Sequence, residues 1–174
     1  MLGQVRNGLV VALTLVAISV SWTLAAPAGA AKKVKVCGLV TQAQVAAITG
    51  NANNGPQDAG SFLGDGSCDF LTDGGPGADV RLVVSSDIKR DAKAHLTFAA
   101  KDRFDKTYGS DEPVAGLGKL ALYHFDGGSS VAQSALLVVK GKKAVQVILT
   151  GNGVDHDTGL TKTKGLAQAV FKKL

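Results

Sequence analysis

Three apolar runs separated by glycine-rich turns dominate the second half of the chain. They cover residues 120–125, 135–139 and 144–149, and each is rich in the β-branched, aliphatic or aromatic residues that strands favour. The middle run is apolar without alternation, as expected of a strand that is covered on both faces. The pattern therefore predicts a three-stranded antiparallel meander.

Three other segments carry the spacing and the end signals of helices. Thr41 and Gln44 form a capping-box pattern, and Gly50 suits the left-handed position that follows a helix. A second helix is predicted over residues 88–106, where apolar side chains recur at helical spacing. A third helix, capped by Asp155 or Asp157, is predicted at the end of the chain.

Two further strands are predicted at residues 68–72 and 78–85, with a weaker one around residues 61–63. Together the elements predict an α+β domain in which helices cover one face of a curved antiparallel sheet. Similar glycine-rich turns in the two halves fit two copies of a helix-plus-meander unit. The alternative is that glycine-rich turns resemble one another without any duplication.

The first thirty residues have the pattern of an export signal rather than that of a folded element. Arg6 precedes an apolar stretch over residues 9–26, and Ala28-Gly29-Ala30 provides the small residues of a cleavage site. A retained membrane anchor is the alternative, but the stretch is barely of spanning length and no charged stop follows it. We expect residues 1–30 to be a cleaved signal peptide and residues 31–174 to be one secreted, extracytoplasmic domain.

The exported part is moderately basic. Without Arg6, 18 of the 19 Lys and Arg residues stand against 14 Asp and Glu residues, which gives a formal charge of +4. The lysines are scattered rather than gathered into a patch with the aromatic platforms that nucleic-acid binding needs. We therefore expect a monomer without a nucleic-acid partner and, at most, weak attraction to an anionic envelope surface.

Cys37 and Cys68 are the two cysteines of the sequence, and both lie in the exported part. In an oxidising compartment an even pair favours a disulfide bond. A metal site or a catalytic thiol would need a Cys-x-x-Cys pair or a neighbouring histidine, and neither cysteine has one. Lipidation of Cys37 is not expected, because Val36 stands where a lipoprotein signal requires a small residue.

Groups that could perform catalysis are few. Asp155-His156-Asp157 is the densest cluster of metal-type ligands, but helix capping already accounts for these residues. His124 lies in a predicted strand without a neighbouring carboxylate or nucleophile, and His95 falls on the solvated side of the predicted second helix. No nucleophile elbow or phosphate-binding glycine motif occurs in the sequence. We therefore expect no enzyme, no metal and no cofactor; a hydrolase or metal enzyme that uses His124 or His156 is the least favoured alternative.

Four short motifs stand out in the exported part. They are Cys37-Gly38-Leu39-Val40-Thr41 with Ala43 and Val45, Gly66-Ser67-Cys68-Asp69-Phe70, Val114-Ala115-Gly116-Leu117-Gly118, and Leu137-Val138-Val139-Lys140-Gly141. Together they resemble small exported proteins and lipoproteins of actinobacteria that are grouped as domains of unknown function. They are also similar to the extracellular sensor domains of some actinobacterial receptor kinases. The resemblance implies a helix-and-sheet domain at the cell envelope and carries no catalytic residue; the missing lipoprotein signal is a departure from it.

These observations favour a secreted, non-catalytic binding or sensor-like domain that acts at the cell envelope. Its ligand would be a small apolar or envelope-derived molecule or a protein partner. Alternation along residues 120–125 places Tyr123 and Phe125 on one sheet face and His124 on the other. With Phe70, these two aromatic residues are predicted to line a ligand site on the concave face. The alternative is a purely structural interaction protein with a filled core between helix and sheet.

Overall fold

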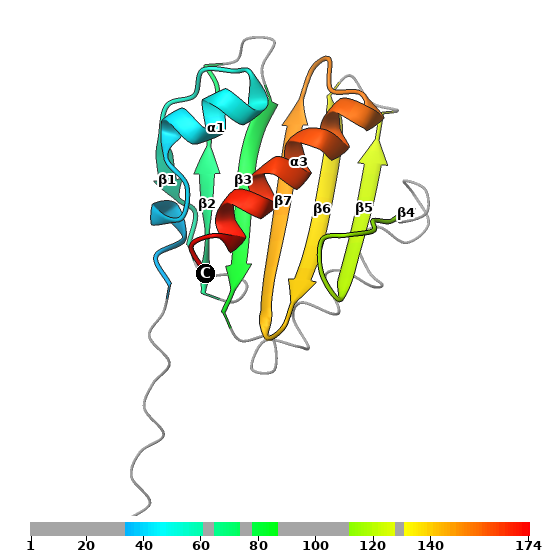
Figure 1. Cartoon of the computed structure of the whole chain (residues 1–174). Coiled ribbons are helices and arrows are strands. Elements are labelled where there is room, and N and C mark those ends of the chain that lie inside the picture. Colours follow the sequence, from blue (N-terminus) through cyan, green and yellow to red (C-terminus); the bar gives the residue numbers. More distant parts are fainter. Residues whose placement is uncertain (1–33, 61–64, 74–77, 87–111, 128–130) are drawn as a thin grey trace, which may run out of the picture. The chain divides into compact units, whose positions relative to one another are not determined.

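In the part of the chain that it describes, the computed structural model has one open, curved antiparallel sheet with two α-helices lying across one face (Figure 1). The described residues are 34–60, 65–73, 78–86, 112–127 and 131–174. They confirm the predicted α+β class. The signal segment, the weak strand at residues 61–63 and the helix at residues 88–106 are predictions that lie outside the described residues.

The elements follow one another in the chain in an order close to the predicted one. They are η1 (Val36–Gly38), α1 (Gln42–Thr49), β1 (Pro56–Asp58), β2 (Gly66–Phe70), β3 (Ala78–Ser85), β4 (Glu112–Pro113), β5 (Leu120–Asp126), β6 (Ala132–Lys140), β7 (Lys143–Gly151) and α3 (His156–Phe171). The strand order in the sheet is β1-β2-β3-β7-β6-β5-β4, and every neighbouring pair is antiparallel. The predicted meander is therefore confirmed as β5, β6 and β7, while the duplication stays a prediction.

The start of the domain is held by a helix cap and a disulfide bond. The Thr41 side chain accepts a hydrogen bond from the Gln44 amide at 3.2 Å, and the Gln44 side chain accepts one from the Thr41 amide at 2.9 Å. Gly50 ends α1 with a φ of 75°. The bond between Cys37 and Cys68, 31 positions apart, links the turn before α1 to β2. The capping box and the disulfide were both predicted and are confirmed.

Helix α3 crosses the sheet in front of β7 and β6 (Figure 1). Asp155 caps it, because its carboxylate accepts a hydrogen bond from the Thr158 amide at 2.7 Å. The first turn lies so close to the sheet that a Cβ at Gly159 would collide with the side chains of Ser134 and Tyr123. Gly159 therefore lowers the intrinsic stability of the helix but allows the helix to pack this closely against the sheet.

The hydrophobic core lies between the helices and the sheet. It contains alternate strand residues, among them Phe70, Leu82, Leu136, Val147 and Leu149, and the helix residues Val45, Leu166 and Val170. Fully burying one such aliphatic or aromatic side chain contributes about 1.5–3 kcal/mol. Strand β6 is buried on both faces from Ser134 to Val138, as its unbroken apolar run predicts.

Candidate functional site

The three aromatic residues predicted to bind a ligand are packed in or against the core. Phe70 and Tyr123 are 0% exposed and Phe125 is partly buried, all on the sheet face that the helices cover. The Tyr123 hydroxyl lies 3.1 Å from Ser134 Oγ and donates a hydrogen bond to the His156 carbonyl at 2.8 Å. Burial raises the pKa of this tyrosine. Phe70 and Tyr123 therefore present no surface to a ligand in this structure, and their predicted ligand role stays a prediction.

His124 lies on the opposite sheet face from Tyr123, as alternation predicts, and is only 4% exposed. His124 is therefore a buried residue of strand β5. A general base needs to reach a substrate proton at hydrogen-bond distance, and a side chain that is 4% exposed offers little surface for that contact. His95, the other histidine considered above, lies outside the described residues.

His156 is held by two carboxylates at the start of α3. Its Nε2 lies 2.5 Å from Glu112 Oε1 of β4, and its Nδ1 lies 2.9 Å from Asp157 Oδ1. The bond to Asp157, followed by the bond to Glu112, raises the pKa of His156. Asp155, the N-cap of α3, accepts hydrogen bonds from Thr158, and these bonds lower the pKa of its carboxyl group.

This cluster forms a clamp in which His156 joins the start of α3 to β4. Both imidazole nitrogens are already in hydrogen bonds with carboxylates, so neither can bind a metal ion or take a substrate proton unless one of these bonds breaks. Within the described residues, no group of three or more His, Cys, Asp or Glu side chains is placed to hold a metal ion. Sequence reasoning found His156 but missed Glu112, because 44 positions separate the two residues.

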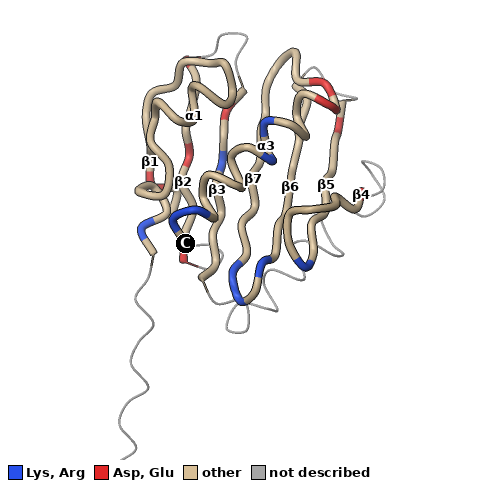
Figure 2. The backbone as a smooth tube through the Cα atoms, in the orientation of Figure 1, with Lys and Arg blue, Asp and Glu red and all other residues tan. Residues whose placement is uncertain are grey.

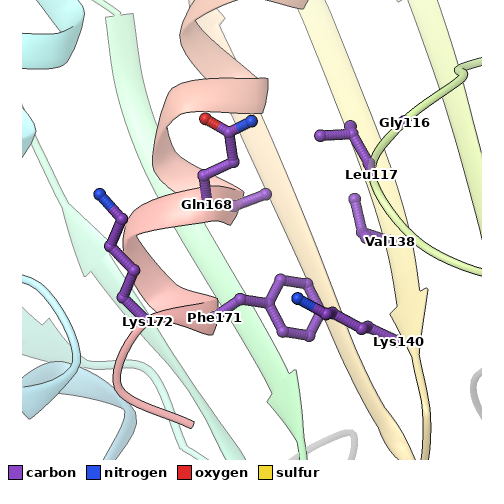
Figure 3. Close-up of a pocket in the computed structure, with 8 residues that line it drawn as sticks. Gly116, Leu117, Val138, Lys140, Gln168, Phe171 and Lys172 are labelled. Carbon is purple, nitrogen blue, oxygen red and sulfur yellow. The ribbon is translucent and has the colours of Figure 1, made fainter.

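A hollow lies between the C-terminal half of α3, the end of β6 and the loop before β5. Its volume is about 350 Å³, and Figure 3 shows its lining. The lining residues are Gly116, Leu117, Val138, Lys140, Ala167, Gln168, Phe171 and Lys172. We call this hollow the α3–β6 pocket.

Local glycine geometry explains why the loop borders the pocket. Gly116 has a φ of 81°, which a residue with a side chain rarely adopts. At Gly118 a Cβ would collide with the Val139 backbone, so only glycine lets the loop lie this close to β6. The Lys119 amide then donates to the Val139 carbonyl at 2.9 Å. The turn glycines recognised in the sequence thus place Leu117 at the edge of the pocket.

The pocket combines an apolar wall with cationic side chains. Leu117 and Phe171 are partly buried, Val138 is 1% exposed, and Lys140 and Lys172 are exposed. Among the described lining residues there is no carboxylate, so the local charge is positive. Figure 2 places lysines at the Lys140–Lys143 turn and near the end of α3, while carboxylates gather around the start of that helix. An anionic group beside an apolar body therefore fits this pocket best.

Sequence reasoning missed the α3–β6 pocket. Its walls come from three segments, and each apolar residue in them has the ordinary pattern of a core position. A weak signal was present in the apolar Leu117 between two glycines and in the lysines that directly follow Val139 and Phe171. Neither feature indicates a pocket until the segments lie side by side.

Comparison with protein-family models, with curated protein sequences and with solved structures finds no match to this chain. Among the residues that the structure describes, no helix is both long enough and apolar enough to cross a membrane.

Proposed function

We propose that this chain is a non-catalytic, extracytoplasmic binding domain that takes up a small amphipathic anion in the α3–β6 pocket. The observation that carries the proposal is the pocket itself, in which Lys140 extends beside a wall formed by Leu117, Val138 and Phe171. Lys172, whose side chain points to the other side of α3 in Figure 3, adds a second positive charge nearby. Its volume of about 350 Å³ falls within the range of small-molecule sites. An acyl chain with a carboxylate or phosphate head has the required chemistry.

The size of each contribution sets the expected affinity. Covering apolar wall surface contributes about 25 cal/mol per Å², whereas an exposed ion pair with a lysine contributes at most about 1 kcal/mol. Loss of translational and rotational freedom offsets much of this gain. We therefore expect a dissociation constant of ~10⁻⁴ M, with most of the affinity from the apolar body and the charge preference from the lysines.

Two features support an extracytoplasmic location for this domain. The bond between Cys37 and Cys68 is typical of proteins that fold in an oxidising compartment. The signal-like first thirty residues agree with export, and the envelope role fits the resemblance to exported actinobacterial sensor domains. Intact-mass measurement on protein from its native host tests this part, because a mass that includes residues 1–30 contradicts cleavage.

Ligand binding is tested with three probes that separate charge from apolar surface. Octanoate has both features, acetate has only the anionic head, and octylammonium has the apolar chain with the opposite charge. We expect octanoate alone to shift the backbone NMR signals of Leu117, Val138 and Gln168 in a saturable way. Equal binding of octylammonium would contradict the anionic preference, and no binding by octanoate would contradict the proposal.

The chain offers matched lysine controls for this experiment. Lys140→Ala with Lys172→Ala removes both pocket lysines, and we expect octanoate affinity to fall about tenfold. Lys142→Ala with Lys173→Ala removes the same charge from adjacent positions that do not line the pocket. Equal losses in the two double variants would show general attraction to a basic surface rather than binding in the pocket.

A purely structural or interaction role is the second candidate, and the filled core supports it. Phe70 and Tyr123 are 0% exposed within the core between the helices and the sheet, so this part of the domain packs around its own side chains. An unchanged NMR spectrum with all three probes would favour this role.

A further inference from the structure

A second pocket lies on the sheet face away from α1 and α3. Its volume is about 250 Å³. It is lined by Asp69, Leu71, Asp79, Val80, Arg81, Gln133, Ile148 and Thr150. These residues come from or adjoin strands β2, β3, β7 and β6, which lie next to one another in the sheet. We call this hollow the second-face pocket.

Strand register arranges its side chains in two parallel rows. In the first row, Asp69 on β2 pairs with Arg81 on β3, which pairs with Ile148 on β7. In the second row, Asp79 on β3 pairs with Thr150 on β7, which pairs with Gln133 on β6. Members of a row are one strand spacing apart, about 4.8 Å, and the rows are two residues apart along each strand. The polar groups therefore stand on a framework held by the backbone ladder.

The first row is internally neutralised. Arg81 donates from Nε and Nη2 to the two carboxylate oxygens of Asp69, both at 2.7 Å. This bidentate pair uses one edge of the guanidinium group and leaves its remaining N–H groups as donors. Ile148, next in the row, supplies apolar surface beside these donors.

The second row offers both acceptors and donors. Asp79 Oδ1 accepts from the amide and the hydroxyl of Thr72 at 2.7 and 3.0 Å, while Oδ2 has no bond to any described residue. Gln133 Nε2 lies 3.5 Å from Thr150 Oγ1, at the outer limit of a hydrogen bond. A ligand can therefore bond to these groups without breaking a strong internal contact.

We propose that the second-face pocket binds a neutral saccharide through two or three adjacent hydroxyl groups. Each sugar hydroxyl both donates and accepts, which matches a row that runs from the carboxylate of Asp79 through the hydroxyl of Thr150 to the amide of Gln133. The carbon–hydrogen face of the ring packs on Ile148 and Leu71. This site is separate from the α3–β6 pocket and does not depend on the function proposed for it.

Charge selects against anionic ligands in this pocket. Two carboxylates face one guanidinium group in the lining, so the local charge is negative and an anion is repelled. The anion preference expected for the α3–β6 pocket is thus absent here. A small amine is the competing class, because the unbonded oxygen of Asp79 would attract it.

The experiment titrates the full folded chain with glucose, galactose and mannose, and separately with glucosamine and glucuronate. We expect a neutral sugar to shift the backbone signals of Asp79, Ile148 and Gln133 saturably at millimolar concentration. Glucuronate is expected to bind more weakly than the matching neutral sugar. Absence of saturable shifts with all three neutral sugars, or binding confined to glucosamine, would overturn the proposal.

Two conservative variants test the residues that make the site. Thr150→Val keeps the shape of the side chain and removes the hydroxyl, and Gln133→Ala removes the amide donor. Each is expected to weaken sugar binding about 3–10-fold, the effect of one lost hydrogen bond. Thr161→Val, at an exposed position of α3, is the matched control and leaves sugar affinity unchanged. Unchanged affinity in both pocket variants would overturn the assignment of this site, and retained backbone spectra show that the variants fold.

Discussion

His156 at the start of α3 holds the edge strand β4 through Glu112, with Nε2 2.5 Å from Oε1. The two side chains are 38% and 52% exposed, so water weakens the pair. Asp157 contacts the other imidazole nitrogen. The rings of Tyr123 and Phe125 pack against the imidazole in T-shaped arrangements, with centroid distances of 5.2 and 5.7 Å. One imidazole thus links a two-residue strand at the edge of the sheet to a helix.

This clamp predicts a stability that falls as pH rises. The folded pKa of His156 is raised above its ordinary value of 6.5, so its contribution is fully present below that value and is lost as pH rises through the folded pKa. Urea denaturation of the wild type at a series of pH values measures the effect. Asp155 has the opposite pH dependence. Its pKa is lowered in the folded protein, so its contribution to stability is present above the ordinary carboxyl pKa and is lost as pH falls through the folded pKa.

Two variants identify the group that causes this pH dependence. His156→Gln is expected to flatten the dependence above about pH 6.5, because it removes the titrating ring. Glu112→Gln keeps the ring and removes one of its carboxylates, so it should reduce the dependence only in part. The assignment to His156 fails if the wild type and His156→Gln follow the same curve.

The disulfide is expected to make a large contribution to stability. It closes a loop between residues 31 positions apart, for which the chain-entropy model gives about 3.5–4 kcal/mol. Replacing Cys37 and Cys68 together by serine should lower the free energy of unfolding by that order. Thiol titration of unfolded, unreduced protein checks the bond directly, and two reactive thiols per chain would contradict it.

Two glycines of α3 should respond in opposite ways to the same change. In an exposed helix interior, Gly→Ala stabilises by up to about 1 kcal/mol. At Gly159 the added methyl collides with Ser134 and Tyr123, so we expect a loss of about 1–3 kcal/mol. At Gly165 the nearest atom is the Cγ2 methyl of Ile48 at 3.1 Å, a contact that a shift of a few tenths of an ångström relieves, so we expect the change to be neutral or stabilising.

Thermal denaturation of Gly159→Ala and Gly165→Ala, measured under identical conditions, tests this difference. A gain in melting temperature for both variants would show that the first turn of α3 is less closely packed than the structure indicates.

Tyr123 provides a test of its core role. Tyr123→Phe keeps the ring and removes the hydroxyl that contacts Ser134 and the His156 carbonyl. We expect a loss of about 1–2 kcal/mol in the free energy of unfolding and no change in octanoate binding. Denaturant unfolding and the NMR titration measure the two quantities on one sample. A variant with unchanged stability but weaker binding would restore the ligand role that the sequence predicts for this residue.

Local patterns were enough to predict most of the elements that the structure describes. Alternation and apolar runs located β5, β6 and β7, and the Thr41–Gln44 pattern located the start of α1. The two cysteines predicted their bond, because only one pairing exists within the chain. These features depend on neighbours along the chain or on composition, so the sequence contains the information directly.

The candidate sites depend on relationships that are not local. Period-two alternation shows that Tyr123 and Phe125 share a sheet face, but it does not show which face the helices cover, and the predicted ligand face became the core. Glu112 meets His156, and Phe171 lies across the α3–β6 pocket from Leu117, only after distant segments pack together. The rows of the second-face pocket likewise depend on the pairing of β3 with β7. Strand order and helix docking come from the burial of the whole core, a cooperative property that no single segment encodes.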